Sequence, residues 1–165
     1  FDAPLVTREA ETDGETALPV VAIDRLGGDR AFRGLALGLG LSGGAVALTT
    51  GWESPSMLVA GDQPADMVVA LERLKELHGG AVVASGGAVL AEWRAELGGL
   101  YSLAPLGQVV SEVATVNGAL RDLGCPMPNP LLSLETLTTA AIPFLRLSAD
   151  GYVRLTDGAR LGLEV

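Results

Sequence analysis

Two segments of the chain space their hydrophobic residues three to four positions apart, which is typical of amphipathic helices. The first covers about 62–78, where Asp62 or Gln63 suits an N-cap, Pro64 suits the first turn and Gly79-Gly80 marks the end. Its apolar positions are Met67, Ala70, Leu71, Leu74 and Leu77. The second covers about 105–123 and ends at Gly124, with the apolar positions Leu106, Val109, Val110, Val113, Val116, Leu120 and Leu123. We expect two main helices, and a short third one within 131–140.

The other hydrophobic runs are short and separated by glycine-rich turns, which is typical of strands. A strand is expected at 19–25 and another at 57–60, and hairpins are expected at 34–50, 81–92 and 144–155. The tetrapeptide Gly-Gly-Ala-Val occurs at 43–46, 79–82 and 86–89, without a common period, and is read as three turns that lead into strands. This mixture favours an α+β fold, a mostly antiparallel sheet of hairpins packed with the two helices. Residues 1–17 are expected to form an N-terminal arm, and 18–165 the domain.

Composition limits which cellular compartment and which classes of binding partner are expected for the chain. The 165 residues carry a net charge of −9, which disfavours binding to nucleic acid or to an anionic membrane surface. At 48% hydrophobic, the chain can bury a core, and no apolar run reaches the roughly 20 residues of a membrane span. The single cysteine, Cys125, excludes an internal disulfide and fits a reducing, cytoplasmic compartment.

Two motifs suggest chemistry, but each has a simpler explanation. Residues 38–43 match G-x-G-x-x-G, and Asp62 follows about twenty residues later, yet a dinucleotide site needs a helix directly after the glycines and a strand is expected there. Cys125 and His78, the only histidine, would have to form a nucleophile–base pair. Each has a structural reason to stand at a helix end, so we expect neither motif to act.

The irregular segment at 51–56 holds the candidate binding residues, Trp52, Glu53, Ser54 and Ser56. Polar side chains on a loop between two apolar strands are often functional, although an ordinary connecting loop remains the alternative. Asp62 and Asp66 are better explained as acids at a helix start than as an acid–base pair. We assign no catalytic residue and no metal ligand in this chain, because one His and one Cys cannot build a typical transition-metal site.

The order of the elements resembles the C-terminal domain of bacterial adenine deaminases, in the amidohydrolase superfamily. The likeness covers roughly 18–155 and rests on order and spacing. The matching stretches are 22–25, 34–41, 44–47, 66–67, 73–74, 79–80, 98–100, 120–125, 129–130 and 142–143. Where that family typically carries Ala-His-Asp-Ser-His-Asn, this chain has Gly51-Trp52-Glu53-Ser54-Pro55-Ser56, so two histidines are replaced by Trp52 and Pro55. Neither replacement can relay a proton or bind a metal.

The resemblance implies an accessory domain rather than a complete enzyme. In the family, a preceding barrel carries the metal whose activated water deaminates adenine to hypoxanthine and ammonia. We therefore expect no cofactor in this chain and expect its partner to be such a barrel, in the same or a neighbouring chain; a homo-oligomer remains open. The chain lacks an initiator Met, consistent with a piece of something longer. The alternative is a non-catalytic purine-binding or assembly domain in which Trp52 stacks on a planar ring; a freestanding enzyme is a third hypothesis.

Overall fold

The computed structural model describes residues 16–54, 56–140 and 144–162, so most of the expected arm lies outside the described residues. Both main helices are confirmed within two residues of their expected ends, and the short third helix is confirmed too. In chain order the elements are β1 (Leu18–Asp24), β2 (Ala31–Ala36), β3 (Ala45–Leu48), β4 (Ser56–Gly61), α1 (Pro64–Glu76), β5 (Gly80–Ser85), β6 (Ala88–Arg94), α2 (Leu106–Asp122), α3 (Pro130–Thr136), β7 (Leu145–Ser148), β8 (Gly151–Arg154) and β9 (Arg160–Leu161).

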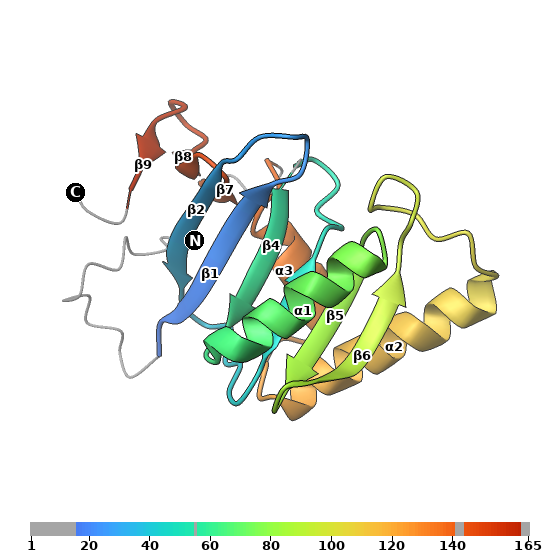
Figure 1. Cartoon of the computed structure of the whole chain (residues 1–165). Coiled ribbons are helices and arrows are strands. Elements are labelled where there is room, and N and C mark those ends of the chain that lie inside the picture. Colours follow the sequence, from blue (N-terminus) through green and yellow to red (C-terminus); the bar gives the residue numbers. More distant parts are fainter. Residues whose placement is uncertain (1–15, 55, 141–143, 163–165) are drawn as a thin grey trace.

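The centre of the molecule is a six-stranded sheet in the order β2-β1-β4-β3-β5-β6 (Figure 1). Every neighbouring pair is antiparallel, which confirms the α+β class. The expected hairpin at 81–92 is β5–β6, and the expected final hairpin is β7–β8. All candidate residues of the 51–56 segment lie at the end of this sheet where β1 stops and β4 starts.

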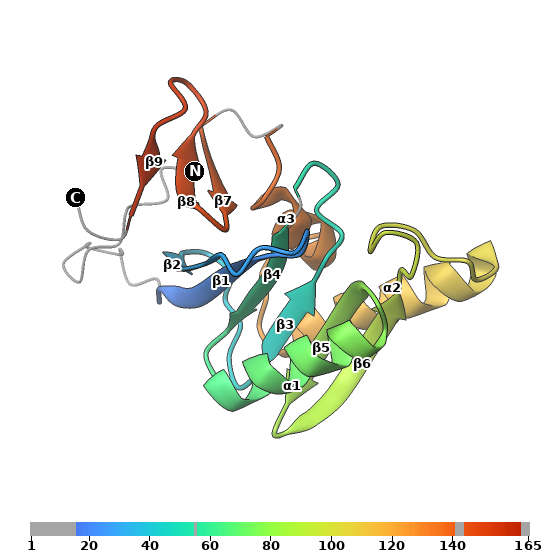
Figure 2. The ribbon, with the colours of Figure 1, turned by 45° about the horizontal axis from the view of Figure 1, so that its top comes forward.

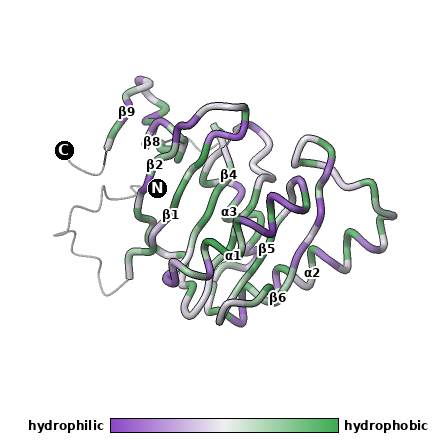
Figure 3. The backbone as a smooth tube through the Cα atoms, viewed as in Figure 1, coloured by the Kyte–Doolittle hydropathy of each residue, from purple (hydrophilic) through white to green (hydrophobic). Residues whose placement is uncertain are grey.

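Helices cover both faces of the sheet, α1 on one face and α2 with α3 on the other (Figure 1). Alternate residues of β3 serve the two cores: Ala47 packs towards α1, whereas Val46 and Leu48 belong to the core of α2 and α3. Because β3 and β5 are covered on both faces, their sequences are continuous apolar runs and do not alternate between apolar and polar residues. The hydropathy along β1, β4 and β5 follows this burial (Figure 3).

The three-stranded sheet β7-β8-β9 packs beside β1 and β2 (Figure 2). Tyr152 joins the two sheets: its hydroxyl donates to the Leu35 carbonyl at 2.6 Å and accepts from the Leu35 N–H at 2.7 Å. Its ring meets Phe32 edge to face, with ring centroids 5.0 Å apart. These contacts hold the small sheet against the edge of the large sheet that is formed by β2.

The expected hairpin at 34–50 is wrong. Its two halves are not paired: β2 is an edge strand on β1, whereas β3 lies between β4 and β5. The connecting residues bury Leu39 and Leu41 in the core but follow no strand path. Gly38 and Gly40 have φ values of 73° and 63°, left-handed backbone that breaks a strand. The alternating glycines and leucines thus belong to a loop that connects β2 to β3 and buries its leucines in the core. The G-x-G-x-x-G motif in this loop is followed by a strand, β3, and not by a helix.

Each main helix has one detail that the sequence left open, and for α1 it is which of Asp62 and Gln63 is the N-cap. The N-cap of α1 is Gln63, which makes no side-chain capping bond, while the Asp62 carboxylate accepts from the N–H groups of Gly43 and Gly44 at 2.9 and 3.0 Å. These bonds lower the pKa of Asp62. In α2 the apolar stripe is buried only in the C-terminal half, because the start of the helix extends past the edge strand β6 and leaves Leu106 and Val110 exposed (Figure 1).

Candidate functional site

The segment at 49–54 leaves β3 and is tied to the region of α3. The Thr50 hydroxyl donates to Glu135 at 2.5 Å, and the Thr139 hydroxyl donates to Glu53 at 2.5 Å. Burial raises the pKa of Glu135, and the bond from Thr50 opposes that shift. Gly51 packs so closely on Thr138 that a side chain would collide there. The segment is therefore held in place by residues of α3 and of the chain that follows it. A preorganised site requires such support.

The four predicted binding residues point to two different places. Trp52 is 48% exposed, and Glu53 is exposed beside it. Ser54 and Ser56 are buried, and the Ser56 N–H donates to the Ser54 hydroxyl oxygen at 3.2 Å. The two serines line a pocket that Trp52 and Glu53 do not line. The structure therefore pairs the two serines but does not bring all four residues to one site.

The pocket beside the two serines has a volume of about 220 Å³ and gathers charged residues. We call it the arginine pocket; it is lined by Asp24, Arg30, Ser54, Ser56, Arg146, Ser148, Ala149, Asp150, Val153, Gly158 and Arg160. Arg30 bridges both of its carboxylates, contacting Asp24 at 2.5 Å and Asp150 at 2.8 Å. A hydrogen bond from the Leu26 N–H, together with Arg30, lowers the pKa of Asp24. Both carboxylates of this pocket are thus already paired.

A second pocket, of about 340 Å³, lies at the C-terminal end of α1. Arg25 donates to the Gly98 carbonyl at 2.6 Å, and the Thr49 hydroxyl donates to the Gly99 carbonyl at 2.7 Å. His78 also lines it and has a left-handed backbone, with φ of 62°. Burial lowers the pKa of the Arg25 guanidinium. These contacts fix the glycine loop at 98–99 against the end of the sheet.

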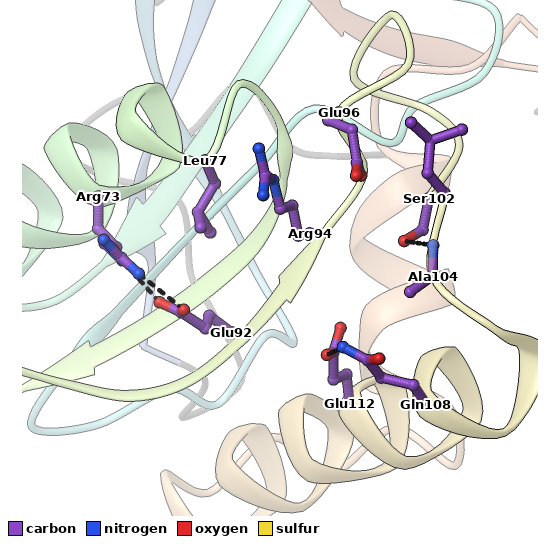
Figure 4. Close-up of a pocket in the computed structure, with 10 residues that line it drawn as sticks. Arg73, Leu77, Glu92, Arg94, Glu96, Ser102, Ala104, Gln108 and Glu112 are labelled. Carbon is purple, nitrogen blue, oxygen red and sulfur yellow. Dashed lines mark hydrogen bonds and ion pairs between the residues drawn. The ribbon is translucent and has the colours of Figure 1, made fainter.

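A third pocket, of about 460 Å³, lies between α1, β6 and the start of α2 (Figure 4). Arg73 of α1 contacts Glu92 of β6 with two hydrogen bonds, at 2.7 and 2.8 Å, and the facing Gln108 donates to Glu112 on α2. The paired Arg73 lowers the pKa of Glu92. Glu96 also lines this pocket, and its Oε2 atom is buried without a hydrogen-bond partner. Arg73 and Glu92 are therefore already paired with each other, as in a structural ion pair between α1 and β6.

Nucleophile and metal candidates do not converge in the described part of the chain. His78 follows the end of α1, and Cys125 is buried just after α2. Within residues 16–54, 56–140 and 144–162, no group of three or more His, Cys, Asp or Glu residues lies together as ligands for a metal ion. None of the described helices is long and apolar enough to cross a membrane.

Comparison with known proteins decides the family. A family model described as the adenine deaminase C-terminal domain matches residues 3–159, nearly the whole chain. This chain belongs to that family. The resemblance noted from ordered short stretches is therefore confirmed.

Adenine deaminases of several organisms share this region. That of Methylobacterium nodulans is 39% identical over 148 residues, which are 90% of this chain and 26% of that protein. Those of Cereibacter sphaeroides (strain KD131) and Oleidesulfovibrio alaskensis are 38% and 40% identical, over 81% and 73% of this chain. The chain thus spans about a quarter of the length of these adenine deaminases.

Some residues that line the second pocket already stood in the stretches that resemble adenine deaminases, although no single motif pointed to this pocket. Arg25, Gly79 and the pair Gly98-Gly99 belong to three of the stretches that carried the likeness, and all of them line this pocket. They are far apart in the sequence, so only the antiparallel order of the sheet brings them together. A further stretch, at 142–143, lies outside the described residues.

Proposed function

We propose that this chain is the accessory C-terminal domain of an adenine-deaminase-like amidohydrolase, a bacterial cytoplasmic enzyme. In this proposal the domain carries no catalytic residue and packs against the metal-bearing barrel of the same or a neighbouring chain. That barrel would supply the water that converts adenine to hypoxanthine and ammonia. The sequence supports this division, because this chain offers a single imidazole and a single thiol as its soft metal ligands.

The observation that carries the docking role is an exposed apolar surface at the start of α2. Leu103, Leu106 and Val110 are 67%, 78% and 59% exposed, and Tyr101 beside them is 68% exposed. Exposed large apolar side chains that cluster on a protein surface are typical of interaction sites. The relatives are about four times as long as the region they share with this chain, so the rest of such a polypeptide is the natural partner for this surface.

A complementation assay tests the proposal. The Methylobacterium nodulans adenine deaminase would be expressed without the region that this chain matches, and ammonia release from adenine would be measured with and without this chain. We expect this chain alone to release no ammonia, and expect it to raise the activity of the truncated enzyme. The double variant Leu106→Glu, Val110→Glu should abolish that gain, whereas the control Glu72→Gln, on the exposed face of α1, should keep it.

Two outcomes would overturn the proposal. Ammonia release by this chain alone, lost on Glu53→Gln, would make it an enzyme in its own right. Stoichiometric zinc, iron or manganese in the dialysed protein would contradict the absence of a metal site. If the glutamate pair left complementation unchanged, the docking surface would lie elsewhere.

A second candidate function is binding of a purine-like ring, favoured by the half-exposed indole of Trp52 next to Glu53. A planar ring stacked on this indole should quench its fluorescence. Trp93, the other tryptophan, provides an internal reference in Trp52→Phe. Saturable quenching by adenine or hypoxanthine that disappears in this variant would support binding, and unchanged emission at high ligand concentration would leave an assembly role, to be examined by sedimentation.

A further inference from the structure

A row of side chains crosses the small sheet and faces the arginine pocket. Arg146 of β7 is paired with Val153 of β8, which is paired in turn with Arg160 of β9. Directly paired residues in an antiparallel sheet project from the same face. The opposite face holds Leu147 and Tyr152, which are buried in the core. The pairing therefore sends both arginines away from the core, and both line the pocket.

The two arginines of this row are not neutralised in the way that Arg30 is. Arg30 uses Nε and both terminal nitrogens on Asp24 and Asp150. Arg160 comes only within 3.8 Å of Asp150. The Nε of Arg146 is buried and has no hydrogen-bond partner among the described residues. A buried N–H without a partner is unfavourable, which points to an acceptor that residues 16–54, 56–140 and 144–162 do not provide.

The charge of the lining has the opposite sign from that of the chain. Three arginines face two aspartates here, a difference of +1, in a chain of net charge −9. Arg30 contacts both aspartates, and these three residues together carry −1, so Arg146 and Arg160 leave the lining with its excess of +1. A positive pocket on an acidic protein is a feature that attracts small anions while the rest of the surface repels larger polyanions.

Hydroxyl groups of the segment that leads into β4 complete the lining. Ser54 lies just before β4 and Ser56 begins it; both are buried and line the pocket together with residues of the small sheet. The Ser54 oxygen accepts from a backbone N–H, so its own proton is left to donate. The Ser56 hydroxyl makes no side-chain hydrogen bond within the described residues. Donors in the lining thus come from two parts of the fold, guanidinium groups from the small sheet and hydroxyls from the segment at the start of β4.

We propose that the arginine pocket binds a small tetrahedral oxyanion of the phosphate class. Arg146 and Arg160 would contact the anion through charge-assisted hydrogen bonds, and the hydroxyls of Ser54 and Ser56 would donate to its remaining oxygens. A tetrahedral oxyanion can accept from donors in several directions through four oxygens, whereas a planar carboxylate offers only two oxygens in one plane. This site is independent of the deaminase role and of the exposed surface of α2.

Isothermal titration of the chain with inorganic phosphate, at constant ionic strength set with chloride, tests the proposal, with acetate as the comparison anion. We expect saturable binding of phosphate and much weaker binding of acetate. Arg146→Met keeps the apolar stem and should weaken phosphate binding by about tenfold or more. The matched control is Arg154→Met on the same small sheet, because that guanidinium is occupied by Asp157; its phosphate affinity should stay within about twofold.

Arg160→Met protects the test against misfolding, since this side chain is 67% exposed and its loss should leave the fold intact. It should also weaken phosphate binding. No saturable heat with phosphate, or equal losses in Arg146→Met and Arg154→Met, would overturn the proposal. Acetate that binds as tightly as phosphate would also overturn it, and would indicate a site for carboxylate side chains of a partner polypeptide.

Discussion

Two copies of the same tetrapeptide, Gly-Gly-Ala-Val, lie at opposite ends of the sheet, and the glycines of the two copies are packed differently. Gly86 and Gly87 form an open turn between β5 and β6, and a side chain at either would meet nothing within 4 Å. At the other end, Gly79 and Gly80 have φ values of 125° and 122°, and a side chain on Gly80 would collide with the Trp93 carbonyl. Identical residues therefore meet loose packing at one end and very close packing at the other.

The same contrast holds for the polar residues at the two ends. Where β5 turns into β6, the buried Asp66 closes the turn by accepting from the N–H groups of Gly86 and Gly87, at 3.2 and 2.7 Å. At the opposite end, Arg25 and Thr49 hold the loop at 98–99, which lines the second pocket, and the arginine pocket is lined by Asp24 and Ser56 at the same end. At one end of the sheet, carboxylates accept from the backbone amides of the turns, and at the other end polar side chains surround two pockets.

The largest effect on the stability of the fold is expected for Gly80→Ala. The new methyl group meets the Trp93 carbonyl and forces a left-handed backbone on alanine, so we expect a loss of about 3 kcal/mol or more in the free energy of unfolding. Urea denaturation of the purified chain measures it. The control Gly86→Ala has φ of 60° and open space, and should lose only about 1 kcal/mol. Equal losses in the two variants would contradict the contrast between the ends.

Asp66→Ala should have the next largest effect. Loss of the buried carboxylate leaves two amide groups of the turn without an acceptor, and we expect a loss of about 2 kcal/mol by urea denaturation. The amides of Gly86 and Gly87 should exchange faster in the variant than in the original chain, whereas those of β5 should change less. Unchanged protection of these amides would mean that the turn holds without Asp66.

A smaller effect, which depends on pH, is expected for Asp62→Asn. The bonds from Gly43 and Gly44 lower the pKa of Asp62 in the fold below its ordinary value of 3.8. Its contribution to stability is therefore present above that value and is lost as the pH falls through the folded pKa. Thermal unfolding of both proteins between pH 7 and about pH 2 should show a gap of about 1 kcal/mol that closes in acid. A gap that stays constant with pH would contradict this assignment.

The smallest effect is expected for Glu135→Gln, at the end that carries the candidate sites. Burial raises the folded pKa above the ordinary value of 4.5, so the ionised carboxylate destabilises the fold as the pH rises from 4.5 through the folded pKa. The glutamine still accepts from Thr50 but carries no charge. We expect the variant to be slightly more stable than the original chain at pH 8 and no more stable at pH 4. A variant that is less stable at pH 8 would show that the charge itself is needed.

Local patterns in the sequence determined the elements well wherever hydrophobic spacing and turn residues agreed. The helix expected at about 62–78 is found at Pro64–Glu76, because Pro64, the apolar stripe and the two glycines all favour nearly the same boundaries. The β5–β6 hairpin followed from glycines flanked by β-branched residues. The family was also accessible from ordered short stretches, because relatives keep the order of elements even where single residues differ.

Only the tertiary structure decided which strands are neighbours and which side chains share a pocket. The segment at 34–50 has the local pattern of a hairpin, yet β3 gains more from burial between β4 and β5 than from pairing with β2, because burial on both faces removes the most apolar surface from water. Likewise, Ser54 and Arg146 lie far apart in the chain and meet only because the small sheet packs against β1 and β2. Local sequence encodes the conformation of a segment, whereas the partners of its side chains depend on how distant segments share one core.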